Sequence, residues 1–445
     1  MALTDSRWQR ITMLCALYFA QGFPKGFMVT AVINYLIDRG VSDTEVGYLT
    51  AIVVVPWTFK LAWAPLIDSV TIRSMGRRRV WIIAAELMMA ASLLSMLGVG
   101  DLAERLDFLF WMFFIHNCFA SLQDVATDAL AVDVLQPHEH GKMNGLMWGA
   151  KSIGIAAGGW AMHIVIDAWG LEAAVAIQTA VLLLIMLLPI FILERPGEKR
   201  FPWSPGQTSG AASTENFRSV WSVLKDLIRG FSLVSTSMMF VFGTVCVLGW
   251  GIVEVACKTF YRNELQWESI YVSEVMSLAV AAQMVGAIVG GMLADRFGQR
   301  KIMLIGFSIY AAMHLVFGSF PGLWKIHTVT WLYLFLNPGV LIVSTVTFTA
   351  MCMKISWTRA SATMFTIYMT VSNLGHAVGN AALGPLTDTL KLSYQQVFWS
   401  AGIVTLLPLL LLPLINPDEV DAARRKEKAR ESAQRGTEAP VPDAE

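Results

Sequence analysis

Three aspartates stand inside a long apolar segment of this sequence. Residues 121–135 read SLQDVATDALAVDVL, which places Asp124, Asp128 and Asp133 where a membrane or core helix usually carries leucine. Asp124 and Asp128 are four residues apart, so on a helix they share one face. Ionisable groups in such segments are costly to bury and most often mark the path of a substrate or a proton.

Lysines fall at the same predicted depth in neighbouring apolar segments. A helical rise of about 1.5 Å per residue, counted from the predicted helix ends, brings two aspartates and two lysines to one layer near the midplane. That layer comprises Lys60, Asp124, Asp128 and Lys151, and Lys25 is expected slightly farther from the cytoplasm. Either some of these groups bind a solute or carry a proton, or they form structural ion pairs between helices. The spacing leaves both interpretations open, and also which lysine pairs with which aspartate.

A second group of charges lies near the predicted outer surface. Glu254 and Lys258 are spaced i, i+4 in the favourable order, and Glu274 begins the next predicted helix at similar depth. This arrangement predicts an outer gate or an ordinary ion pair at the membrane edge. Glu86 is expected close enough to the cytoplasm to be solvated or paired with loop arginines. His376, like the other histidines in apolar segments, is expected to be a packing residue.

The composition indicates that membrane helices carry these residues. Of 445 residues, 55% are hydrophobic and only 15% are charged, whereas about a quarter are charged in a typical soluble domain. Repeated apolar runs of membrane-spanning length predict twelve transmembrane helices. Most lysines and arginines fall in loops on one side, which predicts a multi-pass protein of the inner membrane with both termini in the cytoplasm. We expect helices over residues 11–37, 44–68, 80–100, 107–135, 142–167, 171–193, 231–258, 269–294, 302–321, 326–352, 360–388 and 396–415.

The longest break between predicted helices divides them six and six. We expect a first bundle over 1–193, a cytoplasmic linker with an amphipathic helix over 194–230, a second bundle over 231–415 and a charged cytoplasmic tail over 416–445. The halves repeat: AKSIGIAAGGWAMHIVID (150–167) aligns without gaps with VSNLGHAVGNAALGPLTD (371–388). The shared Gly-x-x-x-Gly spacing predicts close helix packing. Such six-helix repeats are typical of transporters that rock about a midplane site.

The stretch GMLADRFGQRK (291–301) resembles the cytoplasmic loop motif of the major facilitator superfamily, and PLID (65–68) followed by GRRR (76–79) repeats its theme. The resemblance implies an all-α membrane fold of twelve transmembrane helices in two six-helix pseudo-repeats. An aspartate at a helix end beside basic residues can form a charged latch that holds the cytoplasmic side shut. The alternative is that the arginines only follow the positive-inside rule. The predicted cytoplasmic gate comprises Asp68, Arg77, Arg78, Asp133, Asp295, Arg296 and Arg300.

The first half also resembles the peptide and acetyl-coenzyme A transporter family, which includes bacterial muropeptide permeases and has siderophore permeases as near relatives. The stretches YFAQGFPKGF (18–27), FKLAWAPLIDSV (59–70) and SLQDVATDALAVDVL carry this resemblance. It implies import, coupled to protons, of a medium-sized solute such as a muropeptide, acetyl-coenzyme A or a siderophore.

Near Gly22, Pro24 and Gly26, where a helix break is expected, Lys25 is the candidate for binding an anionic group of the substrate. The expected substrate-binding or proton-coupling residues are Lys25, Lys60, Gln123, Asp124, Asp128 and Lys151.

Other classes of protein fit the sequence less well. It contains no nucleophile elbow, zinc-protease motif or phosphate loop, and its five cysteines lack metal-ligand spacing, so we expect neither an enzyme nor a metal or cofactor. The formal net charge of zero gives no indication of a nucleic-acid partner. The expected partners are a small-molecule solute, protons and the lipid bilayer, with the chain as a monomer. The remaining alternatives are a drug or metabolite exporter of the same superfamily and a membrane sensor that does not transport.

Overall fold

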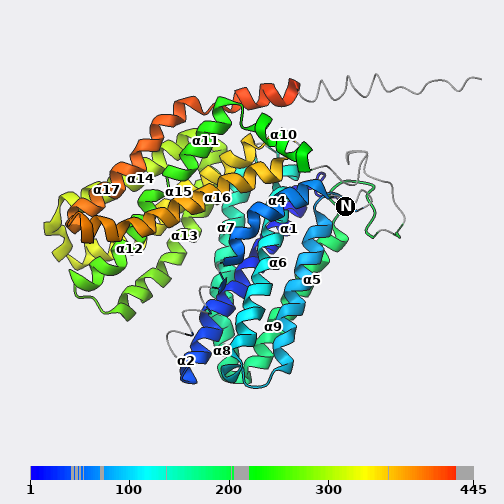
Figure 1. The fold of residues 1–445 in the computed structure, drawn as a ribbon, viewed down its shortest axis with the longest axis horizontal. Helices are drawn as coiled ribbons and strands as arrows, with labels where there is room; N and C mark the ends of the chain where they lie inside the picture. Colours follow the sequence, from blue (N-terminus) through cyan, green and yellow to red (C-terminus); the bar gives the residue numbers. More distant parts are fainter. Residues whose placement is uncertain are drawn as a thin grey trace, which may run out of the picture.

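A computed structural model of the chain shows two helical bundles that meet at one end and diverge from it (Figure 1). The residues that it describes are 2–41, 45, 49, 52–53, 55–70, 75–136, 138–201, 203–204, 220–358 and 360–426, without the side chains of 37, 38, 220, 258, 269, 270, 273, 274, 277 and 388.

The first bundle contains the helices that carry the aspartates and lysines. Its elements are α1 (Arg7–Gly26), η1 (Phe27–Val32), α2 (Ile33–Asp38), η2 (Val55–Phe59), α4 (Lys60–Ser69), α5 (Arg79–Leu94), η3 (Ser95–Gly98), η4 (Leu102–Glu104), α6 (Leu106–Val134), α7 (His140–Ala156), η5 (Ala157–Ala161), α8 (Met162–Trp169) and α9 (Leu171–Phe191). The expected break near Lys25 is wrong, because α1 runs through Pro24 and continues as the π-helical turn η1. Part of the predicted span 44–68 lies outside the described residues.

The second bundle follows a short helix. Its elements are α10 (Val220–Gly230), α11 (Val234–Val245), α12 (Leu248–Asn263), α13 (Ser269–Phe297), α14 (Gln299–Ser319), η6 (Pro321–Lys325), α15 (His327–Ile355), α16 (Ser361–Gly384), η7 (Pro385–Thr389), α17 (Tyr394–Leu406) and η8 (Leu407–Leu414). Each predicted span contains helical residues in the described part of the chain. Seven described segments are long and apolar enough to cross a membrane: Arg79–Gly98, Leu171–Phe191, Val234–Asn263, Leu278–Phe297, Gln299–Ser319, His327–Ile355 and Tyr394–Leu414.

Close helix crossings occur at equivalent places in the two halves. A Cβ atom added to Gly158 in η5 would lie 1.9 Å from the carbonyl oxygen of Phe23 in α1. A Cβ atom added to Gly375 in α16 would lie 1.9 Å from the carbonyl oxygen of Thr244 in α11. Only glycine permits such contact, so the close packing predicted from the repeated Gly-x-x-x-Gly spacing is confirmed.

The two bundles contact each other through the helices that bear the repeated motifs. Helix α7 packs against α13 and α15, while α16 packs against α4 and α6. One cluster of buried apolar side chains runs from Phe113 in α6 to Phe348 in α15 and Tyr368 in α16. A second cluster, around Phe260 and Phe398, lies in the second bundle. The N-terminus and the helix at residues 417–426 both lie at the end where the bundles meet (Figure 1).

Candidate functional site

Asp124 is the centre of a buried ionic cluster that joins three helices of the first bundle. Lys60 of α4 donates to Asp124 Oδ2, and Lys151 Nζ of α7 lies 3.6 Å from Asp124 Oδ1. All three side chains are almost fully buried. The ring of Trp57 lies beside both ammonium groups, with its centroid 4.8 Å from Lys60 Nζ and 4.9 Å from Lys151 Nζ. The structure thus assigns both lysines to one aspartate, which the spacing had left open.

Asp128 has a different environment from Asp124, although both lie on the same face of α6. The Tyr18 hydroxyl of α1 donates a 2.5 Å hydrogen bond to Asp128 Oδ1. Among the described residues, Asp128 forms no ion pair. Sequence reasoning quoted Tyr18 only as part of a family stretch, so its role as the partner of Asp128 was missed. The two carboxylates are therefore unequal, because only Asp124 has its charge balanced by direct cation contacts.

A chain of hydrogen bonds leads away from the ionic cluster. Lys151 Nζ donates to Gln21 Oε1 at 2.9 Å, and Gln21 Nε2 donates to Gln123 Oε1 at 2.9 Å. Gln123 Nε2 in turn donates to Glu86 Oε1 at 3.0 Å. These residues come from α7, α1, α6 and α5, so the chain links four helices. Gln123, predicted as a site residue, is the junction, while Gln21 was not singled out from the sequence.

Glu86 lies inside the bundle rather than near water, so its expected solvation or pairing with loop arginines is wrong. Its side chain is 0% exposed, and Oε2 has no hydrogen-bond partner within the described ranges. Its helix α5 packs between α6 and α9, and this packing turns the carboxyl group toward Gln123. A buried carboxyl group without a cation beside it is least costly in its neutral form.

Lys25 is the predicted site residue for which the described part of the structure shows no bonded partner. Its side chain is half-buried on α1, four residues from Gln21 and so on the same helix face. In the described part of the chain it forms no hydrogen bond and no ion pair. Lys60 and Asp124 lie near enough to act on its charge. An ammonium group in this setting offers a contact point for an anion.

At the end where the bundles meet, two aspartates each accept hydrogen bonds from the other half of the chain. Asp68, at the end of α4, accepts from Thr363 N at 2.9 Å and Thr363 Oγ1 at 2.8 Å. Asp295, near the end of α13, accepts from the backbone N–H groups of Gly141 at 2.8 Å and Lys142 at 2.6 Å. Each carboxylate thus satisfies backbone donors in the first turn of a helix in the other half. The two contacts are equivalent under the internal repeat.

The remaining predicted gate residues divide into two groups. Arg78 bridges Asp68 and Asp133, with Nη2 2.8 Å from Asp68 Oδ1 and Nε 2.8 Å from Asp133 Oδ2. Arg77 Nη2 lies 3.2 Å from Asp68 Oδ1. Asp133 also accepts from Ser361 Oγ of the second bundle at 3.4 Å. The structure thus brings together the four predicted gate residues of the first half.

The basic residues of the second-half motif do not join Asp295. The Arg296 guanidinium lies 5.3 Å from the centroid of the Phe297 ring, and Arg300 lines a separate cavity. Over the described ranges, neither arginine forms an ion pair with Asp295. The expectation of a charged latch here is corrected, because backbone N–H groups of α7 satisfy both oxygens of Asp295.

The predicted outer gate is described only in part. Glu254 Oε2 lies 2.7 Å from His376 Nε2, which joins α12 to α16, and the His376 ring stacks on Trp250 with centroids 3.8 Å apart. His376 therefore does more than pack, contrary to expectation. The side chains of Lys258 and Glu274 lie outside the described part of the structure. In that part, no three His, Cys, Asp or Glu side chains gather closely enough to hold a metal ion.

Two family models match the chain. The BT1 family matches residues 21–316, and the Major Facilitator Superfamily matches residues 239–442. An anhydromuropeptide permease of Escherichia coli K12 is 23% identical over 422 residues, which cover 91% of this chain and 79% of that protein. An uncharacterized protein of Haemophilus influenzae is 22% identical, covering 94% and 97%. An uncharacterized protein of Schizosaccharomyces pombe is 28% identical, but over only 31% of this chain and 27% of that protein.

Solved structures share the fold at low sequence identity. A proton:xylose symporter has a TM-score of 0.66 and 13% identity, with 94% of this chain and 99% of that chain covered. A Major Facilitator Superfamily transporter, FucP, in the outward conformation, has a TM-score of 0.64 and 13% identity, with 91% and 98% covered. At this identity the solved structures support the fold alone. The chemistry of the site follows from the charged residues of this chain.

Proposed function

The chain belongs to the BT1 family and is a multi-pass transporter of the major facilitator superfamily, and from this premise we propose that it imports a medium-sized anionic solute, of the muropeptide type, together with protons. The observation that carries this proposal is the imbalance of the buried cluster. Lys25, Lys60 and Lys151 gather near one ion-paired carboxylate, and Lys25 has no bonded partner among the described residues. In this proposal the site binds the solute and the proton and does not change the solute's covalent bonds.

The lysines favour a solute that carries carboxylates. Lys60 is held by Asp124, whereas the longer 3.6 Å contact of Lys151, and the lack of a bonded partner of Lys25 among the described residues, leave two ammonium groups for an incoming anion. A muropeptide presents peptide carboxylates to such groups. The matched anhydromuropeptide permease supports this choice over acetyl-coenzyme A or a siderophore, because it aligns over 91% of the chain.

Asp128 is the carboxyl group best placed to carry the coupled proton. Asp124 is paired with two lysines, whereas in the described part of the chain Asp128 accepts a hydrogen bond from the Tyr18 hydroxyl and forms no ion pair. A proton on Asp128 removes a negative charge one helical turn from Asp124 and makes the cluster more attractive to an anion. Proton binding and solute binding therefore favour each other, and by linkage the coupling is reciprocal.

The contacts between the halves support an outward-facing state of an inner-membrane protein. We assign the joined end to the cytoplasm, because Arg77, Arg78 and other loop cations lie there and cytoplasmic loops carry an excess of lysine and arginine. Both ends of the described chain lie on that side (Figure 1). Alternating access would then break the Asp68 and Asp295 contacts across the two halves, in a protein that acts as a monomer.

The test is uptake of labelled anhydromuropeptide by proteoliposomes under an imposed pH gradient, acidic outside. We expect Asp128→Asn to abolish uphill accumulation while exchange of internal for external solute continues. Lys25→Gln should raise KM at least tenfold, whereas the exposed control Lys325→Gln should not change it. Uphill uptake that survives Asp128→Asn would refute the proton assignment. Binding without any transport would identify a sensor, and transport only outward would identify an exporter.

A further inference from the structure

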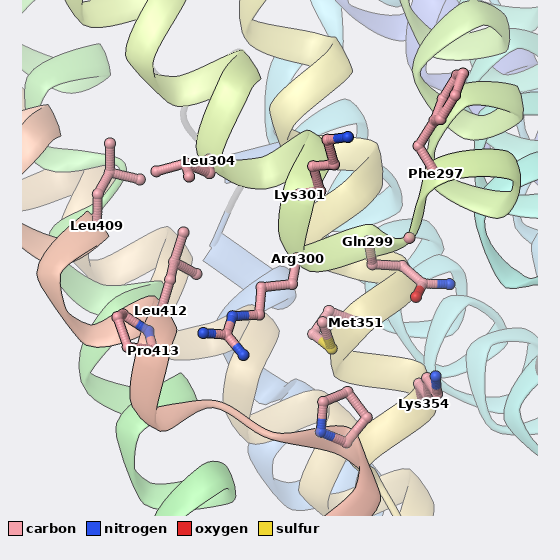
Figure 2. Close-up of a pocket in the computed structure, with 12 residues that line it drawn as sticks. Phe297, Gln299, Arg300, Lys301, Leu304, Met351, Lys354, Leu409, Leu412 and Pro413 are labelled. Carbon is pink, nitrogen blue, oxygen red and sulfur yellow. The ribbon is translucent and has the colours of Figure 1, made fainter.

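A cavity of about 500 Å³ lies outside the transport site, in the second bundle (Figure 2). Its walls are the start of α14, the end of α15 and the segment η8 with Pro417. It thus lies at the end where the two bundles meet, close to the turn between α13 and α14. Neither the proton site nor the lysine cluster described above contributes a residue to it.

The polar side of this cavity carries only positive charge. Arg300, Lys301 and Lys354 line it, and none of the other described lining residues carries a carboxylate. In the described part of the chain, none of the three cations forms an ion pair. Arg424 lies next to them, with Nη2 donating to the carbonyl oxygen of Lys354 at 3.0 Å, and its Nη1 lies 3.9 Å from Asp421 Oδ1 outside the cavity lining. The backbone N–H groups at the start of α14 add the positive end of a helix dipole.

The other side of the cavity is apolar. Leu409 and Leu412 of η8 are buried there with Met351 of α15, whereas Leu304 of α14 is half-exposed. Figure 2 shows the Arg300 side chain extended toward Leu412 and Pro413. Leu410, on the same segment η8, is 75% exposed and faces away from the protein interior. A ligand that fills this cavity therefore needs an anionic group beside an apolar chain.

We propose that this cavity binds the phosphate headgroup of an anionic phospholipid from the cytoplasmic leaflet, with the acyl chains lying along η8 and α14. The proposal rests on the orientation assigned above, which puts the cavity at the cytoplasmic surface. Basic pockets between transmembrane helices on that side are suited to anionic headgroups. Because α14 follows the turn after Asp295, a lipid bound at the start of α14 lies beside the end of α13, whose Asp295 contacts the other half at Gly141.

The test measures binding of a fluorescent short-chain phosphatidylglycerol to the purified full-length protein in detergent. Phosphatidylcholine of the same chain length and inorganic phosphate serve as comparison ligands. We expect saturable binding of phosphatidylglycerol at least tenfold tighter than of phosphatidylcholine, with weak competition by inorganic phosphate. Arg300→Gln and Lys354→Gln should each weaken this binding at least tenfold, and the exposed control Arg425→Gln should leave it unchanged.

Several results would overturn the proposal. Equal losses in all three variants would show diffuse attraction to surface charge rather than a site. Full competition by millimolar inorganic phosphate would identify a free-anion site, and absence of saturable binding would leave no lipid site. If Arg300→Gln fails to fold, Lys354→Gln and the comparison of the three ligands on the unmodified protein decide the question. Muropeptide uptake is not part of this assay, so its outcome is independent of the transport proposal.

Discussion

The contact between Asp68 and Thr363 allows a quantitative test of closure at the end where the two bundles meet. Both bonds from Thr363 to Asp68 Oδ2 cross between the bundles, at 2.9 Å and 2.8 Å, and must break when that end opens. The bonds from Arg77 and Arg78 to the same carboxylate stay within the first half. These internal bonds contribute to the stability of both states, so they largely cancel in the equilibrium between closed and open forms.

The expected shift in the equilibrium between closed and open forms follows from the two bonds that Thr363 donates to Asp68. A hydrogen bond to a charged acceptor contributes about 1.5–3 kcal/mol. Thr363→Val removes the hydroxyl donor and keeps the backbone donor, so it should cost the closed state about 1.5 kcal/mol. Asp68→Asn removes the charge from both bonds and should cost about 3 kcal/mol. About 1.4 kcal/mol corresponds to a factor of ten in an equilibrium constant. The ratio of open to closed protein should therefore rise roughly tenfold in Thr363→Val and roughly a hundredfold in Asp68→Asn.

The populations can be measured from spin-label distances between the end of α4 and the start of α16 in a cysteine-free background. Asp101→Asn is the matched control, since Asp101 forms a 3.0 Å ion pair with Arg39 inside the first half, where both are partly exposed. We expect the control to leave the distance distribution unchanged. An unchanged distribution in Asp68→Asn, accompanied only by a lower melting temperature, would show that this carboxylate supports the fold and does not set the state.

Lys60→Ala should destabilise the protein by about 3 kcal/mol, because it leaves a buried carboxylate short of a cation, and Asp124→Asn should partly rescue it. Strictly additive losses of unfolding free energy in this double-mutant cycle would argue against direct coupling. Gly158→Leu should prevent the crossing with Phe23 and abolish stable expression, whereas wild-type melting would contradict the packing. Burial and a neighbouring carboxylate raise the pKa of Glu198 to about 7 from 4.5, so the folded protein binds this proton more tightly than the unfolded chain. Thermal stability should therefore fall as pH rises from about 4.5 to 7, and Glu198→Gln should flatten this fall; an unchanged pH profile would count against it.

The helices and the common level of Lys60, Asp124 and Lys151 could be predicted from the sequence because both depend on local properties. The span predicted over 171–193 appears as α9 at Leu171–Phe191, since hydropathy over about twenty residues decides whether a segment is long and apolar enough to cross. The helical rise places Asp124 at the level of Lys60 and Lys151 without knowledge of the fold. Internal repetition likewise revealed the glycines at the close crossings, because their spacing is a property of one helix.

The partners of those charges depended on the tertiary structure. Two residues at one level along their helices meet only if the helices are neighbours and are rotated to face each other. The rise per residue gives neither the neighbour of a helix nor its rotation. Packing of α5 between α6 and α9 turned Glu86 inward to Gln123, against the expectation of solvation. Packing of α13 against α7 directed Asp295 to backbone donors and left Arg300 at a separate cavity. Hydropathy thus indicated which segments are long and apolar enough to cross a membrane, while helix rotation and packing decided what each charge touches.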